Sequence, residues 1–225
     1  MTHKKKKILL TGATPFSDNR GLSAIFRGNI KILKTYFPNA KITVDPLYFS
    51  LFSTYEATIH SKKDSEDIYI IERARHNKYI YFIKVIVRNF LLVLWNIFKY
   101  LGIDITRVLY IDKTLKTYLQ SDIILLTNSG DCFTDRYSNS LIVNLGGFSQ
   151  YFLLSLLNKP HIFLPQTIGP FNNPLIRFIA KFILDRTETI MVREKKTAKY
   201  LETMGIDKRK IFLVPDISFI LVPVS

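Results

Sequence analysis

Three observations predict an α/β fold with a doubly wound parallel sheet for this chain of 225 residues. Short apolar runs alternate with stretches whose apolar residues recur at helical spacing. Polar, glycine and proline residues separate these segments, and no internal repeat interrupts them. Apolar residues make up 48% of the chain, enough for a continuous buried core. About five or six strands that alternate with helices are typical of a parallel sheet covered on both faces.

The first unit along the chain is predicted to be a strand, a loop, a helix and a second strand. Residues 6–11 form a short apolar run, and a polar loop follows it. Apolar residues at helical spacing span residues 22–37, and Pro38 ends that helix. The run at residues 41–44 is the next strand. Right-handed crossover then makes the two strands parallel.

The second half of the chain repeats this alternation. Residues 47–77 are less regular and predict a loop or a short helical insertion. Beyond residue 104, the expected helices are 113–119, about 148–157, 175–184 and 195–204, and the expected strands are 122–127, 161–165, 189–192 and 210–214.

Residues 79–101 are long enough to cross a bilayer but carry polar and charged side chains. On a helix, five of these fall within about 140° of one face: Lys84, Arg88, Asn89, Asn96 and Lys99. The segment is therefore predicted to be an amphipathic helix that packs on the sheet or under a loop. The alternatives are a basic helix resting on an anionic membrane and a membrane span.

The charge balance favours anionic partners, because 32 Lys and Arg residues stand against 18 Asp and Glu residues. No zinc-type cysteine pair, RNA-binding signature or basic heptad region is present, so no nucleic-acid partner is expected.

The apolar run Ile8–Leu10 is shorter than the roughly 7–15 apolar residues of a signal peptide. A single cysteine, Cys132, suits a reducing compartment. We therefore expect a cytoplasmic protein, with the inner face of the membrane as an alternative location.

Candidate site residues follow the strands, because ligands of such sheets bind outside the carboxyl ends of the strands. These residues are Gly12, Asp18, Asn19, Arg20 and Gly21; Asn128, Ser129, Gly130, Asp131 and Asp135; Gln166, Thr167, Gly169 and Pro170; Arg193 and Glu194; and Asp216. The four histidines show no ligand spacing, so no metal site is predicted.

Each candidate has two interpretations. Gly12 is not part of a dinucleotide fingerprint, so it either binds phosphate weakly or forms a plain turn. Asp131 and Asp135 form an acid–base pair or cap the following helix. Arg193 clamps a carboxylate or phosphate, or pairs with a nearby acid. Asp216 caps a short turn or faces a partner domain.

Five stretches, in this order, resemble the polysaccharide pyruvyl transferase family: SDNRGLSAI, DIILLTNSGDCFTD, LPQTIGPF, IMVREKKTAKYLETMGI and VPDISF. They cover most of the chain outside residues 47–104. Members of the family have two Rossmann-like domains facing a cleft, as in B-type glycosyltransferases. The resemblance implies that residues 1–225 form the N-terminal Rossmann-like domain, with an insertion and amphipathic helix at about 47–104, and that the second domain is absent from the chain.

Family members move a pyruvyl group from phosphoenolpyruvate onto sugar hydroxyls. The resemblance therefore implies phosphoenolpyruvate as donor substrate, no cofactor, and a glycan or glycan-lipid acceptor. Asp131 is expected to assist proton transfer and Arg193 to hold the donor. The expected substrate-binding residues are Gly12, Asp18, Asn19, Gly130, Gln166, Gly169 and Asp216. The alternatives are a nucleotide-sugar glycosyltransferase, a fragment inactive alone, and a non-catalytic membrane-associated module.

Overall fold

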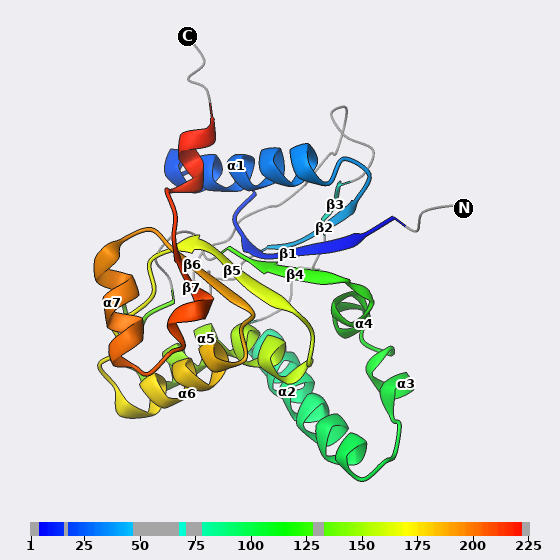
Figure 1. The fold of residues 1–225 in the computed structure, drawn as a ribbon. Helices are drawn as coiled ribbons and strands as arrows, with labels where there is room; N and C mark the ends of the chain where they lie inside the picture. Colours follow the sequence, from blue (N-terminus) through cyan, green and yellow to red (C-terminus); the bar gives the residue numbers. More distant parts are fainter. Residues whose placement is uncertain (1–4, 16–17, 47–67, 71–77, 128–132, 222–225) are drawn as a thin grey trace.

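The computed structural model describes residues 5–15, 18–46, 68–70, 78–127 and 133–221. Its centre is a parallel sheet of seven strands in the order β3-β2-β1-β4-β5-β6-β7 (Figure 1). The strands are β1 (Lys7–Ala13), β2 (Lys41–Pro46), β3 (Ile68–Ile70), β4 (Ile123–Leu126), β5 (His161–Gln166), β6 (Thr189–Val192) and β7 (Ile211–Leu213). The strand order reverses between β1 and β4, which confirms the predicted doubly wound α/β fold.

Helices cover both faces of this sheet (Figure 1). One face carries α1 (Arg20–Tyr36) and the 3-10 helix η2 (Ile217–Ile220), which lies against α1. The other face carries α2 (Lys78–Tyr100), α4 (Lys113–Gln120), α5 (Leu141–Leu156), α6 (Pro174–Asp185) and α7 (Lys195–Thr203). The short helices α3 (Thr106–Leu109) and η1 (Lys208–Lys210) lie in connections.

The strands bury side chains on both sides, which explains their continuous apolar runs. Successive side chains of a strand point to opposite faces. In β1, Leu9 therefore joins the larger core under α5 and α6, while Ile8 and Leu10 join the smaller core under α1. All three are at most 2% exposed.

Two elements differ from the sequence prediction. β3 lies inside the region expected to be a loop or short helical insertion, and it pairs in parallel with β2. Three residues are too few for an alternating pattern to stand out. Helix α5 begins at Leu141, before the expected start near residue 148. Gly146 and Gly147 lie in its first half, and glycine weakens the helical signal.

Helix α2 packs on the domain through a side that combines polar Arg88 and Asn96 with apolar Leu92 and Trp95, which the amphipathic pattern alone did not predict. The Arg88 guanidinium bonds the Asp112 carboxylate at 2.8 Å. The Asn96 side chain donates to the Leu156 carbonyl oxygen at 2.8 Å. From Ile83 to the end of the helix, the part whose side chains the structure describes, the buried residues are Leu92 and Trp95. Within the described ranges, no helix combines the length and apolar character needed to cross a membrane.

His161 at the start of β5 is expected to make stability depend on pH near neutrality. Its side chain is 2% exposed and lies 3.2 Å from the Thr187 hydroxyl. Burial lowers the pKa of His161 below its ordinary value of 6.5. As pH falls through that value, the unfolded chain binds a proton that the folded chain does not, so the folded state is destabilised.

We therefore expect the melting temperature to fall between about pH 7.5 and 5.5, and to fall less in His161→Gln. Asp112 and Asp216 titrate below this window, because their pKa values lie below the ordinary 3.8. Thermal unfolding monitored by circular dichroism at both pH values measures the difference. Identical pH dependence in the two proteins would contradict the assignment.

Candidate active site

The ends of β5, β6 and β7 meet at the carboxyl edge of the sheet. Gln166 is the register partner of Val192, and Arg193 follows Val192 directly. Val214 donates its backbone N–H to the Val192 carbonyl at 2.9 Å, which brings the chain toward Asp216. Sequence-distant residues therefore gather here, and we call them the Arg193 cluster: Gln166, Thr167, Arg193, Glu194 and Asp216.

Arg193 is held in one orientation by its neighbours in the cluster. Its guanidinium forms an ion pair with Asp216 and donates to the Thr167 hydroxyl at 2.9 Å. Thr167 in turn donates to Glu194 at 2.8 Å. The predicted pairing of Arg193 with a nearby acid is thus confirmed, while clamping of a ligand stays a prediction. The Arg193 side chain is 20% exposed, so part of it faces solvent.

Asp216 stabilises both the arginine and the turn that follows. Its carboxylate caps η2, accepting from the Ser218 backbone N–H at 2.9 Å and the Ser218 hydroxyl at 2.8 Å. Burial raises the pKa of Asp216, but the hydrogen bonds from Ser218 and Arg193 outweigh it and lower the pKa overall. Asp216 is therefore ionised at neutral pH, and the predicted capping of a short turn is confirmed.

Gln166 is fully buried on β5, the strand next to the one that Arg193 follows. Its side-chain oxygen and nitrogen have no hydrogen-bond partner among the described residues. A buried polar group left unpaired costs about 1–3 kcal/mol. Gly130 and Asp131, predicted for the same edge of the sheet, lie outside the described residues. The amide of Gln166 is thus a polar group at the candidate site that a ligand could satisfy.

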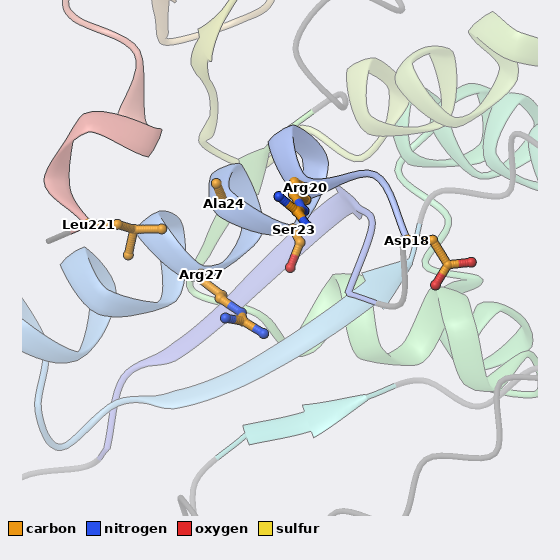
Figure 2. A pocket seen from close by; sticks show the side chains of 6 residues that line it. All are labelled: Asp18, Arg20, Ser23, Ala24, Arg27 and Leu221. Carbon is orange, nitrogen blue, oxygen red and sulfur yellow. The ribbon is translucent and has the colours of Figure 1, made fainter. Parts of the chain in front are cut away.

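Asp18 lines a pocket of about 260 Å³ at the start of α1, which is a second candidate binding site. Figure 2 shows its lining, which includes Arg20, Ser23 and Arg27 from α1 and Leu221 from beyond η2. We call it the α1 pocket. Two arginines make it suitable for an anion. No residue of the Arg193 cluster lines this pocket, and the binding role of Asp18 stays a prediction.

Two other predicted substrate-binding residues have local structural roles. Asn19 caps α1, and its side-chain oxygen accepts from the backbone N–H groups of Gly21 and Leu22 at 2.9 and 3.2 Å. Gly12 lies inside β1 with φ of 75°, where the register with β2 shifts. It is therefore part of the strand rather than of a loop. Their roles in binding stay predictions.

A family model for polysaccharide pyruvyl transferase matches residues 19–224. The chain belongs to the polysaccharide pyruvyl transferase family. The match includes the Arg193 cluster and all but Asp18 of the α1 pocket. A comparison with curated proteins finds no match to this chain. The predicted resemblance is thereby confirmed, and a transferase-type function follows at the level of the family.

In this pyruvyl transferase family member, Asp135 is structural. Its carboxylate accepts the backbone N–H groups of Asn172 and Asn173, each at 2.7 Å, and the residue is 6% exposed. Asp135 therefore stabilises the loop before α6 through these two hydrogen bonds. The prediction that Asp135 caps the following helix is wrong, because the N-cap of α5 is Ser140.

Gly169 shapes the loop between β5 and α6. Its φ is +73°, and a Cβ atom there would lie 2.5 Å from the Tyr200 ring. Tyr200 also accepts the backbone N–H of Phe171 at 2.9 Å through its hydroxyl. The close approach of ring and backbone explains glycine at this position, while its predicted role in binding substrate is untested.

Gly169→Ala is expected to destabilise the protein by at least about 2 kcal/mol, because it adds a steric clash to a strained backbone conformation. Gly146→Ala is the matched control. No atom lies within 4 Å of a Cβ added in α5 at that position, so stability should stay the same or rise. Urea unfolding of both variants measures the difference, and equal midpoints would refute the explanation.

A buried polar network at the ends of β1 and β2 was missed by the sequence analysis. The Tyr118 hydroxyl donates to Asp45 and lies 2.8 Å from the Thr11 hydroxyl. Gln150 donates to the Tyr118 oxygen at 3.0 Å. The signal was available, because Asp45 directly follows a predicted strand, as the other candidates do.

Proposed function

We propose that this protein transfers a pyruvyl group from phosphoenolpyruvate to a sugar hydroxyl of a cell-surface polysaccharide or its precursor. The observation that carries the proposal is the oriented, partly exposed guanidinium of Arg193 at the carboxyl edge of the sheet, in a member of this family. Guanidinium groups bind carboxylate and phosphate through paired hydrogen bonds. Phosphoenolpyruvate carries both groups.

In the proposed reaction, a sugar hydroxyl adds to the enol carbon of the donor, and a proton is added to the methylene carbon. A neighbouring hydroxyl of the sugar then displaces phosphate from the same carbon. The products are a cyclic ketal and inorganic phosphate. Arg193 holds the anionic donor and offsets charge that develops on the departing phosphate. Asp131 is proposed to assist the proton transfers.

In the same proposal, Gln166 is an uncharged residue that contacts the donor substrate. Its buried amide, on the strand next to the one that Arg193 follows, offers two donor hydrogens and one acceptor oxygen. A donor carboxylate or phosphate could accept from the amide nitrogen once bound. Such a contact would relieve the unpaired amide and would favour the bound state.

The test is an assay with phosphoenolpyruvate and an oligosaccharide acceptor that has two adjacent or 4,6-related free hydroxyls. We expect inorganic phosphate to be released and the acceptor to gain one pyruvate ketal by mass spectrometry. Turnover with nucleotide-sugars in the absence of phosphoenolpyruvate would instead identify a glycosyltransferase and overturn the proposal.

A further inference from the structure

Helix α2 presents a continuous apolar face to solvent. The outward side chains of the helix and that of Leu101, directly after it, are between 47% and 63% exposed: Ile83, Ile86, Val87, Phe90, Ile97 and Leu101. We call this set the α2 apolar face. In the turn that follows the helix, Ile103 is also 49% exposed. Contiguous exposed apolar surface of this kind marks a site of contact with a membrane or another protein.

The opposite side of α2 is already occupied, so the exposed face is not the side that packs on the domain. Leu92 and Trp95 are buried in the core shared with α5. Asn96 bonds α5 through the Leu156 carbonyl, and Arg88 bonds α4 through the Thr114 hydroxyl at 3.0 Å. These contacts anchor the helix and leave its apolar face pointing away from the sheet.

Exposed cations outnumber exposed acids around the α2 apolar face, where Asp104 in the turn after the helix is an exposed acid near Arg107 and Lys99. The helix contains no aspartate or glutamate, and Lys84 and Lys99 on it are exposed. Arg107, Lys113 and nearby Lys116 extend the exposed cations along the following helices. Asp112 is engaged by Arg88. An apolar face with an excess of cations on the same and adjoining helices complements a surface that is apolar inside and anionic outside.

This charge pattern also distinguishes between partners. A second copy of the chain would place the same patch on both sides of a two-fold interface, and like charges would then face each other. An anionic lipid surface avoids that repulsion. We propose that the α2 apolar face docks this protein on an anionic bilayer, with Phe90 and its neighbours at the acyl boundary and Lys84 and Lys99 at the headgroups. The proposal does not depend on the pyruvyl transfer reaction.

Sedimentation of the full chain with vesicles tests this. Wild-type protein should bind vesicles of phosphatidylglycerol and phosphatidylcholine, should bind pure phosphatidylcholine weakly, and should bind less as salt rises. Phe90→Asp should lower the partition coefficient at least about tenfold. The matched control is Phe178→Asp on α6, where the side chain is 69% exposed, and it should bind like wild type. Circular dichroism verifies that both variants are folded.

Two double variants test how far charge contributes to vesicle binding. Lys84→Glu with Lys99→Glu should lower partitioning at least about tenfold, since each cation near such a surface contributes measurably. Lys196→Glu with Lys199→Glu on α7 changes the net charge equally and should have a much smaller effect. Absence of binding to anionic vesicles, or equal loss in both pairs, would overturn the proposal. So would a dimer in solution that Phe90→Asp dissociates, because it would assign the face to a second copy.

Discussion

Replacing Arg193 by alanine is expected to lower kcat/KM for pyruvyl transfer by about 100-fold or more, the usual cost of losing a charged group that stabilises a transition state. The guanidinium is oriented by Asp216 and Thr167, so its loss removes a positioned cation rather than a mobile one. Arg193→Lys keeps the charge but loses the planar fork, and it should recover only part of the activity.

Arg209→Ala is the matched control for this prediction. Arg209 is also paired with an aspartate, Asp207, at 2.7 Å, but its side chain is 88% exposed and lies in η1. Its replacement should leave kcat/KM unchanged within about twofold, as expected for a surface ion pair. Thermal unfolding of each variant shows whether any loss of activity reflects loss of fold. Activity of folded Arg193→Ala close to that of wild type would rule out the assigned role.

Phe133→Ala is expected to lower the free energy of unfolding by about 3–5 kcal/mol. Phe133 is fully buried, and its ring centroid lies 4.7 Å from Phe148, 4.6 Å from Tyr151 and 5.3 Å from Phe163. Its carbonyl also accepts the Gly169 N–H at 2.8 Å. The residue therefore joins the end of the β4 loop to the loop after β5, next to the Arg193 cluster.

Urea denaturation followed by fluorescence measures this loss. Phe133→Leu should have a smaller effect, because it leaves a smaller cavity. Phe178→Ala removes an equally large ring from the exposed side of α6 and should change stability by less than about 0.5 kcal/mol. Equal effects at the two phenylalanine positions would show that the ring cluster does not stabilise the sheet edge.

Most of the fold could be predicted because both periodicities are strong in this chain. The expected strand at 189–192 coincides with β6, and the expected helix at 175–184 lies within α6. Asn173 followed by Pro174 also marks the start of α6. Strand β3 could not be predicted, since a three-residue edge strand depends on pairing with β2 rather than on a pattern of its own.

The orientation of α2 could not be predicted either. The period of 3.6 residues shows that the helix has two faces, but it does not show which face the rest of the protein covers. Here Asp112 and the Leu156 carbonyl select the face that carries Arg88 and Asn96. Those partners are distant in sequence, so only the tertiary structure identifies them.

The candidate site was predicted in part. The rule that ligands bind at the carboxyl ends of strands brought Gln166, Arg193 and Asp216 into one group, and the structure places them together. The same rule also included Asp18, which lies in the α1 pocket. Strand order alone does not reveal that η2 runs along α1. The close packing of η2 against α1 depends on Gly28, where a Cβ atom would lie 2.6 Å from the Ile217 carbonyl oxygen.

Calorimetric titration of phosphoenolpyruvate tests most directly whether the Arg193 cluster binds the donor. We predict saturable binding to the wild-type chain, weakened at least about tenfold in Arg193→Ala, the loss expected for one charged hydrogen-bonding partner. Arg209→Ala and Arg27→Ala should bind as the wild type does. Unchanged affinity in Arg193→Ala, or loss of binding in Arg27→Ala alone, would contradict the account and would place the donor in the α1 pocket or elsewhere.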